Sequence, residues 1–395
     1  MNKQTLRDAD LSGKRVLVRV DFNVPISDGV VKDDTRVRAA VPTLQHILEQ
    51  KPQSVLLMSH LGRPKGERKL ELSLKPVADV LSEHMGVDVS FAGDTVGDVV
   101  SDAVQSLPEG GVLLLENTRF YKGETKNDPD LAAHMAEQGD VFVNDAFGTA
   151  HRAHASNVGV TAHLPAYAGL LLEKEIDYLA NTIEDPKRPF IAILGGAKVS
   201  DKIGVIEALL SKVDTLLIGG GMANTFFKAQ GIETANSLVE EDAVETASKL
   251  LAQGGDKIML PVDAVLGDKF DAAASTQAIS VADGVPDGWS IFDIGTETLK
   301  AFEAKLSDVN TVVWNGPMGV FELDPFSGGT FGVARALATA TERGATTIIG
   351  GGDSAAAIEK ADLADKVTHV STGGGASLEM LEGKELPGLA ALLDK

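Results

Sequence analysis

The chain contains no cysteine and few aromatic residues. Its 395 residues include 14 Phe, 3 Tyr and 2 Trp. The absence of cysteine excludes disulfide bonds, thiolate metal sites and thiol catalysis within this chain. No run of about 18 apolar residues occurs, so no segment is expected to span a bilayer. Residues 1–10 also lack the apolar stretch of a signal peptide, which predicts a cytoplasmic location.

Positive charge is scarce as well. The sequence has 36 Lys and Arg against 57 Asp and Glu, for a formal net charge of −21. This excess of negative charge argues against nucleic acid or an anionic membrane as a partner. The hydrophobic content of 44% is too high for a disordered chain. At roughly 100–200 residues per domain, the length predicts two domains or three.

Arginine and glycine are distributed unequally along the chain. Residues 1–170 contain nine of the twelve arginines and seven of the eight histidines, whereas residues 171–395 contain 27 of the 41 glycines. Arginine suits bidentate capture of carboxylates and phosphates, and glycine lets backbone N–H groups approach a phosphate closely. Two halves that bind anions differently would explain these counts, although drift in composition between ordinary domains would also produce them.

Short β-branched and aliphatic runs recur between longer helix-compatible segments. Such nearly continuous apolar runs are typical of strands covered on both faces, as in parallel sheets. The alternation with helical segments predicts an α/β fold built from βαβ units throughout. The expected strands are 16–20, 55–58, 112–115, 141–143, 191–194, 215–218, 258–260, 311–314, 346–349 and 367–370.

Polar and glycine-rich segments directly follow these runs. Ligands in open α/β sheets bind beyond the carboxyl ends of the strands, so this placement predicts an active site, whereas a chance arrangement would scatter the same residues onto helices. In the first half the residues are Asp21, Asn23, His60, Arg63, Asn117, Arg119, Asn144, Asp145, His151 and Arg152. In the second half they form segments 195–198, 219–221, 315–317, 350–354 and 371–375.

Several of these segments have features that suit phosphate. Lys198 and Lys202 follow two glycines at i, i+4 spacing, which predicts two ammonium groups on the first turn of a helix, a suitable polyphosphate site; two solvated surface lysines are the alternative. Segments 350–354 and 373–375 could form anion-binding nests. Asp353 suits Mg²⁺ bound to phosphate oxygens, and a helix N-cap is its alternative role.

A basic set is predicted in the first half. Arg36, Arg63, Arg119 and Arg152 would converge with His60 if the placement at strand ends holds, and converging guanidinium groups repel one another unless an anion lies among them. Taken singly, each arginine would be read as a surface residue.

A domain boundary is predicted near residue 180. Residues 168–179 have a helical pattern with Leu172, Ile176 and Leu179 on one face. Residues 184–189 follow with two prolines, which stop a helix. A helix and a stiff linker between two α/β units would act as a hinge, whereas an ordinary surface helix would have the same pattern.

Seven segments together resemble the phosphoglycerate kinases. The matches are long, occur in the family's order and extend from residue 14 to about residue 388, so the resemblance covers the chain. The matching segments are 14–25, 59–66, 144–154, 195–199, 314–322, 350–354 and 371–377.

The resemblance implies a glycolytic phosphotransferase with a carboxyl group as acceptor. It would transfer a phosphoryl group reversibly between 1,3-bisphosphoglycerate and ADP, giving 3-phosphoglycerate and ATP, with Mg²⁺ as cofactor. The implied fold has two Rossmann-like lobes, each with a parallel sheet flanked by helices. Residues 1–168 would bind the phosphoglycerate with 380–395 packed back on them, 169–189 would form the inter-domain helix and hinge, and 190–379 would bind the nucleotide. The implied enzyme is a monomer.

The resemblance also assigns roles to individual residues. Those implied to bind the three-carbon acid are Asp21, Asn23, Arg36, His60, Arg63, Arg119 and Arg152. Those implied to line the nucleotide site are Gly196, Lys202, Gly219, Asn315, Glu322, Gly351, Gly352, Asp353 and Ser354, with Asp353 on the metal. Those implied to face the migrating phosphoryl group are Arg36, Lys198, Gly373 and Gly374.

Two other functions share some of these features. A nicotinamide-dependent oxidoreductase also has α/β lobes with glycine-rich strand ends, but its dinucleotide-binding fingerprint is missing. A two-lobed binding protein of the periplasmic kind would need an export signal, and it has no use for the two lysines after residue 196.

Overall fold

The computed structural model describes residues 2–395 and divides them into two compact units. The first unit comprises the described residues up to Asp177 together with Glu385–Lys395, and the second comprises Tyr178–Lys384. The division therefore falls within the segment 169–189, which the resemblance implied to be the inter-domain helix and hinge. The C-terminal segment joins the first unit from Glu385, rather than from residue 380.

A six-stranded parallel sheet forms the centre of the first unit, in the order β5-β6-β4-β1-β7-β8. Its strands are β1 (Arg15–Arg19), β4 (Ser54–Met58), β5 (Val89–Phe91), β6 (Gly111–Leu114), β7 (Val141–Asn144) and β8 (Ala166–Ala168). Val16 on β1 lies opposite Val55 on β4 and Val141 on β7. A short hairpin of β2 (Ile26–Ser27) and β3 (Val30–Val31) lies outside this sheet.

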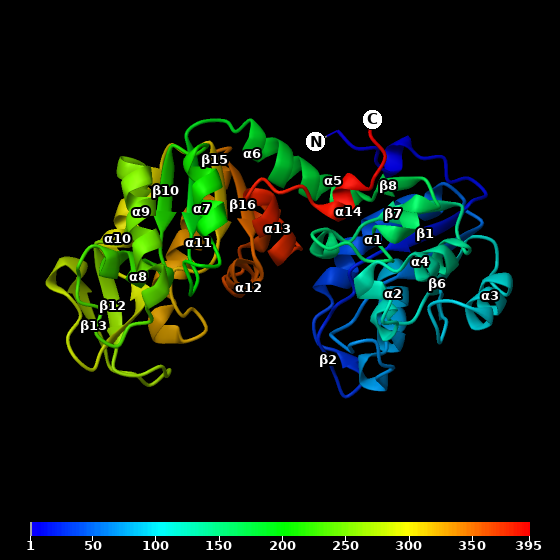
Figure 1. Cartoon of the computed structure of the whole chain (residues 1–395), viewed down its shortest axis with the longest axis horizontal. Helices are drawn as coiled ribbons and strands as arrows, with labels where there is room; N and C mark the ends of the chain where they lie inside the picture. The colour runs from blue at the N-terminus through cyan, green and yellow to red at the C-terminus, as the bar shows by residue number, and fades with distance from the viewer. Residues whose placement is uncertain (1) are drawn as a thin grey trace. The chain divides into compact units, whose positions relative to one another are not determined.

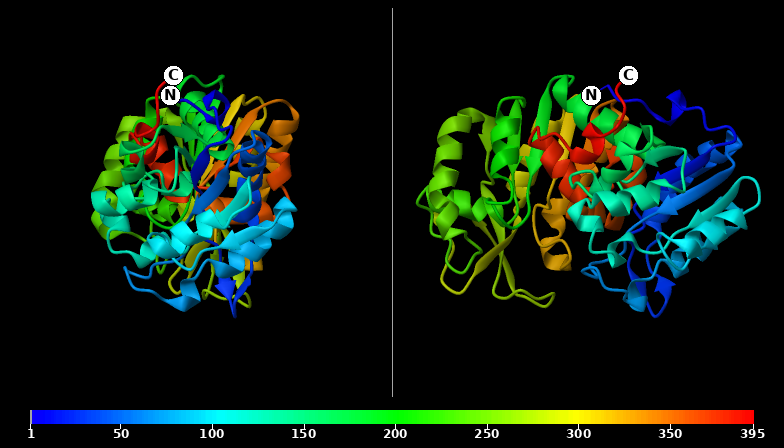
Figure 2. Two further views of the ribbon diagram at one scale, coloured as in Figure 1. Left: turned by 90° about the vertical axis from the view of Figure 1, so that its right-hand side faces the viewer. Right: turned by 45° about the vertical axis from the view of Figure 1, so that its right-hand side comes forward.

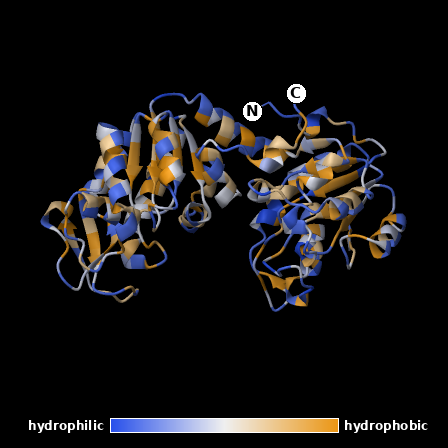
Figure 3. Cartoon of the chain, in the orientation of Figure 1, coloured by the Kyte–Doolittle hydropathy of each residue, from blue (hydrophilic) through white to orange (hydrophobic). Residues whose placement is uncertain are grey.

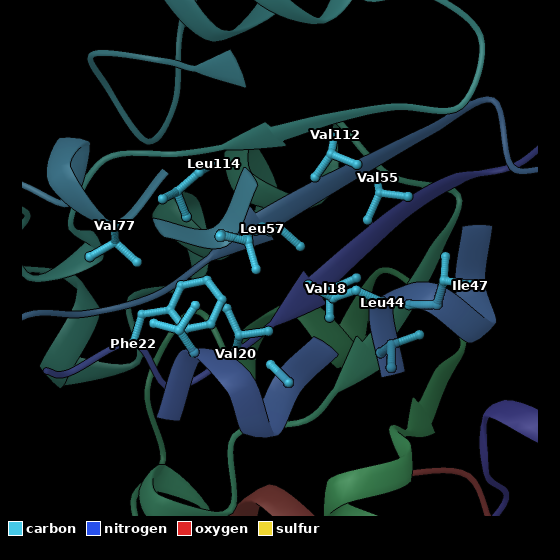
Figure 4. Close-up of a cluster of buried hydrophobic side chains, with 14 of the residues drawn as sticks. Val18, Val20, Phe22, Leu44, Ile47, Val55, Leu57, Val77, Val112 and Leu114 are labelled. Atoms are coloured by element: carbon cyan, nitrogen blue, oxygen red, sulfur yellow. The ribbon is translucent and has the colours of Figure 1, made fainter. Parts of the chain in front are cut away.

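Helices flank this sheet and complete a buried core (Figure 1). They are α1 (Thr35–Glu49), α2 (Lys75–Met85), α3 (Asp98–Gln105), α4 (Pro129–Ala136), α5 (Leu170–Glu175) and α14 (Pro387–Ala390). On α1 the buried Val37, Ala40, Leu44 and Ile47 recur every three or four residues, which places them on one helical face. Figure 4 shows Leu44 and Ile47 in the same cluster as Val18, Val55 and other side chains of the central strands.

The second unit has a parallel six-stranded sheet of its own, in the order β11-β10-β9-β15-β16-β17. Its strands are β9 (Phe190–Leu194), β10 (Thr215–Ile218), β11 (Ile258–Met259), β15 (Thr311–Asn315), β16 (Thr346–Gly350) and β17 (His369–Val370). Helices flank this sheet too (Figure 2). They are α6 (Thr182–Glu184), α7 (Ile203–Leu210), α8 (Met222–Ala229), α9 (Val244–Gly254), α10 (Thr296–Leu306), α11 (Gly328–Glu342), α12 (Gly352–Lys360) and α13 (Gly374–Leu381).

All ten strands predicted from apolar runs are present, with ends that differ by at most two residues. Figure 3 shows why these strands could be predicted from the sequence, since the strands of both units are coloured mainly as hydrophobic. The edge strands β5 and β8 were missed, because a strand of only three residues is too short to show an apolar run of its own.

The prediction of βαβ units throughout is wrong for one part of the second unit. There β12 (Asp263–Gly267), β13 (Thr276–Ser280) and β14 (Ser290–Ile294) form an antiparallel sheet in the order β13-β12-β14. On β13 the residues alternate between exposed and half-buried. A strand with one face in solvent has no continuous apolar run, and this explains why the apolar pattern did not reveal it.

The helix predicted at 168–179 begins later than expected. Ala168 ends β8, and the helical segment runs through α5, a π-helical turn at Ile176–Asn181, and α6, which ends at Glu184 before the two prolines. Leu172, Ile176 and Leu179 are all buried, as the pattern predicted. Among residues 2–395, no helix combines the length and apolarity needed to cross a bilayer.

Candidate active site

The loops after β1 and β4 bring four of the predicted acid-binding residues together in the first unit. The Asn23 side chain accepts a hydrogen bond from Gly62 N at 2.8 Å, which fixes the loop that carries Arg63. Asp21 Oδ1 lies 3.9 Å from Nδ1 of the buried His60. The two loops therefore hold one another, and their polar side chains are gathered at the carboxyl edge of the sheet.

Arg36 joins this group from the first turn of α1. Its Nη1 donates to Asn23 O at 3.1 Å and lies 3.3 Å from Asp21 Oδ1. Both the guanidinium and the carboxylate are partly exposed, so the ion pair itself contributes little stability. Its effect is to orient Arg36 toward the strand ends.

Arg63, Arg119 and Arg152 line one pocket of about 460 Å³. Arg63 and Arg152 are exposed, whereas Arg119 is buried and donates from Nη1 to Gly62 O at 2.8 Å. The Nε of Arg119 is also buried, and it finds no hydrogen-bond partner among the described residues. A buried, incompletely paired guanidinium is costly unless an anion completes its hydrogen bonds.

Ionisation in this region is governed by burial and by mutual repulsion. Burial first, and then the charges of Arg19 and Arg152, lower the pKa of Arg119 to about 10. Burial and the surrounding arginines lower the pKa of His60 well below its ordinary value. His60 is therefore neutral at pH 7, and its ring can accept or donate one hydrogen bond without adding charge.

Sequence reasoning missed several residues of this pocket. Lys65, Lys122 and Lys126 line it together with Tyr121, and all three lysines are exposed. Lys122 and Lys126 follow Arg119 closely in the sequence. This repeated positive charge after Arg119 was the signal that could have indicated them as part of an anion site. The buried Arg19 was also missed, because its position inside a strand gave no polar cue.

The second unit contains a pocket of about 360 Å³ whose floor is formed by glycine-rich loops. Gly196, Glu322 and Asp353 of the predicted nucleotide site line it. Gly219 lies beside it, because it packs against Met318, which lines the pocket. A Cβ at position 219 would come within 2.5 Å of Met318 Sδ. The N–H groups of Gly196 and Gly219 donate to Pro317 O and Leu194 O, both at 2.9 Å, so these two glycines serve the close packing of the loops.

Asn315, Gly351 and Ser354 form a second predicted group next to this pocket. Ser354 Oγ accepts a hydrogen bond from Gly316 N at 2.6 Å, which joins the start of α12 to the end of β15. A Cβ at Gly351 would come within 3.1 Å of Asn315 Nδ2, an atom that is buried and has no partner among residues 2–395. Gly374 packs against Gly352, because its Cβ would lie 3.1 Å from Gly352 N. Gly373 is the N-cap of α13.

The prediction that Lys198 and Lys202 share the first turn of a helix is wrong. The helix α7 begins only at Ile203, and Lys202 is its N-cap residue, because residues 195–202 form turns that follow the backbone of neighbouring loops. Lys198 is exposed, whereas Lys202 is buried, and burial lowers the pKa of its ammonium group. Lys202 Nζ nonetheless lies near Gly196, at 3.7 Å from the position of a Cβ there.

Asp353 lies in the first turn of α12 rather than at its N-cap, which is Gly351. Its side chain makes no capping hydrogen bond and is exposed at the same pocket. No cluster of three or more His, Asp or Glu suited to a metal occurs among residues 2–395. A single carboxylate fits Mg²⁺, which typically takes one or two protein carboxylates together with substrate phosphates.

An apolar wall completes this pocket and was not predicted. Leu238, Phe270, Phe292 and Val320 contribute to it, from the antiparallel sheet and nearby loops. The rings of Phe270 and Phe292 meet edge to face at 5.7 Å. A pocket lined by both glycine loops and apolar side chains suits a ligand that is part phosphate and part aromatic base.

Comparison with known proteins decides the family. The family model for phosphoglycerate kinase matches residues 6–384. The chain belongs to the phosphoglycerate kinase family. The phosphoglycerate kinase of Herpetosiphon aurantiacus is 58% identical over 399 residues, covering 100% of both chains. The cytosolic phosphoglycerate kinase of Triticum aestivum is 55% identical over 393 residues, covering 98% of this chain and 97% of that protein.

A solved structure agrees with this assignment. The phosphoglycerate kinase structure from Coxiella burnetii has a TM-score of 0.88 and 42% sequence identity, covering 98% of each chain. Family membership makes this chain a phosphotransferase with a carboxyl group as acceptor, which interconverts 1,3-bisphosphoglycerate and ADP with 3-phosphoglycerate and ATP. It argues against both the nicotinamide-dependent oxidoreductase and the periplasmic binding protein.

Proposed function

We propose that the first unit binds the phosphoglycerate and the second unit binds the nucleotide. The cationic pocket with Arg63, Arg119 and Arg152 supports the first assignment. The glycine-floored pocket with an apolar wall supports the second. The single observation that carries the proposal is the buried guanidinium of Arg119, whose unpaired Nε calls for an anionic ligand in this unit.

In the acid site, charged groups and polar groups would have different roles. The arginines neutralise the phosphate and carboxylate of the acid through bidentate hydrogen bonds. Asp21, Asn23 and the neutral His60 supply directional hydrogen bonds to hydroxyl groups. Asp21 also restrains Arg36 through their contact at 3.3 Å.

In the nucleotide site, the glycine loops would hold the phosphates and the apolar wall the base. Gly196, Gly219 and Lys202 lie on the phosphate side, with Asn315 and Gly351–Ser354 at the start of α12. Asp353 would hold Mg²⁺, which when bound neutralises charge on the nucleotide phosphates. Glu322, which is exposed at the rim of the pocket, would accept hydrogen bonds from the nucleotide.

The chemical step needs no general base. In the direction of ATP consumption, a carboxylate oxygen of 3-phosphoglycerate forms a new bond to the γ-phosphorus while the bond from phosphorus to the β–γ bridging oxygen breaks, leaving ADP. Because the attacking oxygen is already ionised, this chain's residues contribute alignment and charge neutralisation. Arg36, Lys198 and the loop that contains Gly373 and Gly374 would face the transferred phosphoryl group.

Ligands held on separate units must meet for this step. In-line transfer requires reacting atoms within about 3–3.5 Å, so we propose that the units close upon one another when both ligands are bound. The helical segment and linker at 169–189 would provide the hinge. The enzyme would act as a cytoplasmic monomer on small-molecule substrates alone, without nucleic acid or membrane.

The test is a coupled assay with ATP, 3-phosphoglycerate and Mg²⁺, in which a second enzyme reduces the product with NADH. We expect NADH oxidation that requires all three components and stops when EDTA removes the metal. Calorimetry then assigns the sites: Arg63→Ala should lose affinity for 3-phosphoglycerate and keep affinity for ATP. Loss of ATP affinity in this variant would contradict the assignment of the acid to the first unit.

A further inference from the structure

A buried carboxylate directly precedes two residues that line the cationic pocket, and the sequence analysis assigned it no role. Glu124 begins the 3₁₀ turn η4 (Glu124–Lys126) and is fully buried. Its Oε1 accepts hydrogen bonds from Thr118 Oγ1 at 3.1 Å and from Ser156 Oγ at 2.6 Å. Its Oε2 accepts one from Ser156 N at 3.0 Å. The carboxylate is thus held by three donors.

These donors come from the two segments that carry arginines of the pocket. Thr118 directly precedes Arg119 in the turn η3 (Thr118–Phe120), and Ser156 follows Arg152 by four residues. The backbone adds a further link, since Ala155 N donates to Glu124 O at 2.9 Å. One residue therefore ties together two stretches of chain that are about thirty residues apart in sequence and adjacent at the pocket.

The network also reaches the strand that carries the buried Arg19. Arg19 Nε donates to Ser156 Oγ at 2.8 Å, and its Nη2 lies 3.2 Å from His60 Nδ1. His154 Nδ1 is 3.8 Å from Glu124 Oε1. Through Ser156 the carboxylate is thus connected to Arg19 and from there to His60, which we assigned to the acid site.

The electrostatic surroundings explain why the carboxylate is tolerated in the interior. A buried unpaired charge is very costly, but here Glu124 raises the pKa of both Arg19 and Arg119 against the effect of burial. Together with the partly buried Asp21, it supplies the negative charge beside these arginines. Three hydrogen bonds satisfy it, so the site is both paired and rigid.

We infer that Glu124 is a positioning residue for the phosphoglycerate. By bonding Thr118 and Ser156 it holds the backbones that bear Arg119 and Arg152 at the separation the anionic substrate needs. Glu124 does not itself touch the substrate. This inference rests on the assignment of the acid to the first unit.

One substitution separates this role from a purely electrostatic one, because the two roles predict opposite changes in the affinity for 3-phosphoglycerate. Glu124→Gln keeps the shape of the side chain and removes its negative charge. If Glu124 only balanced charge, the positive potential of the pocket would rise and 3-phosphoglycerate would bind more tightly. If Glu124 positions the arginines, its amide can no longer accept all three hydrogen bonds, the segments shift, and the acid binds more weakly.

We therefore expect Glu124→Gln to weaken 3-phosphoglycerate binding by about tenfold, the usual cost of losing one charged hydrogen bond. KM for the acid should rise, while ATP affinity of the full chain remains unchanged, because the nucleotide pocket belongs to the other unit. Calorimetry with each ligand and steady-state kinetics measure these quantities. Unchanged or tighter binding of 3-phosphoglycerate would overturn the inference.

A matched control exists in the same segment of chain. Glu116 is also buried and also accepts three hydrogen bonds, from Ser73 Oγ at 2.7 Å, Leu74 N at 2.9 Å and Asn117 N at 2.8 Å. It does not bridge the segments of Arg119 and Arg152. Glu116→Gln should lower the melting temperature and leave KM for the acid unchanged. An equal rise of KM in both variants would mean that the effect of Glu124→Gln is merely structural.

A milder variant covers the case in which Glu124→Gln does not fold. Thr118→Val removes one donor and keeps the volume of the side chain, and it should raise KM for 3-phosphoglycerate severalfold at unchanged KM for ATP. A wild-type KM in this variant would count against the inference. Failure of the underlying site assignment is recognised separately, because Arg63→Ala would then bind 3-phosphoglycerate as the wild type does.

Discussion

At the scale of single residues, burial alters the charges available for binding. Arg119 is 7% exposed and His60 is 4% exposed, yet both lie in or beside the pocket proposed for an anion. The cost of desolvating Arg119 is incurred on folding, before any ligand arrives. A substrate phosphate then meets a guanidinium that needs no further desolvation, which favours tight and oriented binding.

Two arginines of the acid site should respond differently to removal. Arg36 is tied to Asp21 and Asn23 and is proposed to reach the transferred phosphoryl group, whereas the exposed Arg63 lines the pocket proposed for the acid. Interactions made only in the transition state affect kcat, and uniform binding affects KM. Arg36→Ala should therefore lower kcat by roughly 10³–10⁵, the range for arginine fingers. Arg63→Ala should mainly raise KM for the acid.

Steady-state kinetics and equilibrium binding on both variants decide this prediction. A wild-type kcat with only a raised KM in Arg36→Ala would show that Arg36 has no special role in the transition state.

Asp293 should make the stability of the second unit depend on pH. Burial raises its pKa to about 7, against hydrogen bonds from Gly329 N and Ile294 N that lower it. The folded state therefore keeps a proton that the unfolded state, with a pKa of 3.8, has already released. Stability from this group is complete below pH 4 and is lost as the pH rises through about 7.

Asp293→Asn removes that titration. Relative to the variant, the wild-type second unit should lose stability by roughly 1–4 kcal/mol between about pH 4 and pH 8, as measured by urea unfolding. The control is Asp287→Asn, which makes the same chemical change at an exposed position of the same unit. A profile of Asp293→Asn parallel to that of the wild type would contradict the raised pKa.

At the scale of elements, the junction of β16 and α12 shows how a turn can build a site. Gly351 has φ +88°, a region that residues with a Cβ rarely adopt, and it packs against Asn315 on the neighbouring strand. The turn brings the N-terminus of α12 and the end of β15 to one place. The first turn of α12 then presents N–H groups and Asp353 to the pocket proposed for the nucleotide.

This junction provides a matched pair of substitutions. Gly351→Ala introduces both backbone strain and a contact with Asn315, whereas Gly344→Ala, at φ +96°, introduces strain with no heavy atom within 4 Å. Both should cost about 1 kcal/mol or more of stability. Only Gly351→Ala should also raise KM for ATP, by about tenfold or more. Equal KM values for ATP in the two variants would show that this turn does not contribute to ATP binding.

At the scale of the whole molecule, the C-terminal segment belongs to the unit that begins the chain. Asn144 Nδ2 donates to Gly388 O at 3.2 Å, and Leu393 N donates to Ala166 O at 3.1 Å. Leu386, Leu389 and Leu392 of this segment are buried. The first unit therefore includes the last residues of the chain, which follow the whole second unit in the sequence.

Substitutions in this segment should affect one unit and not the other. Leu389→Ala, at a fully buried position, should destabilise the first unit by about 2–5 kcal/mol. Leu393→Ala, at a position 38% exposed, should cost much less. Thermal unfolding with 3-phosphoglycerate or ATP identifies the transition of each unit, since each ligand stabilises the unit that binds it. A shift of the ATP-stabilised transition in Leu389→Ala would contradict this separation.

Closure upon binding is a prediction about the complete enzyme. If the acid and the nucleotide occupy different units, each ligand alone can satisfy only half of the contacts that close the molecule. Small-angle scattering should therefore show greater compaction with both ligands than with either one. An unchanged radius of gyration in the ternary complex would argue against closure.

Much of the fold was predictable from the sequence because its signals are local. The central strands β1, β4, β9 and β15 are buried on both faces, so each is an apolar run that can be recognised without knowledge of its neighbours. Strands in parallel register bring their carboxyl ends to one edge. This rule is why positions such as Asn23 and His60 could be expected to lie together, and the roles proposed for them stay predictions.

The tertiary structure decided the features that depend on distant segments. The half-exposed β13 and the short β5 and β8 take their strand form from neighbouring strands, and their own sequences do not indicate it. Lys198 and Lys202 were expected on a helix because spacing alone cannot show that loop packing delays α7 until Ile203. Glu124 gave no signal, because an acidic residue in a loop reads as solvated. Its burial against Thr118 and Ser156 arises only when segments far apart in sequence fold onto one another, since desolvation and pairing are properties of the assembled interior.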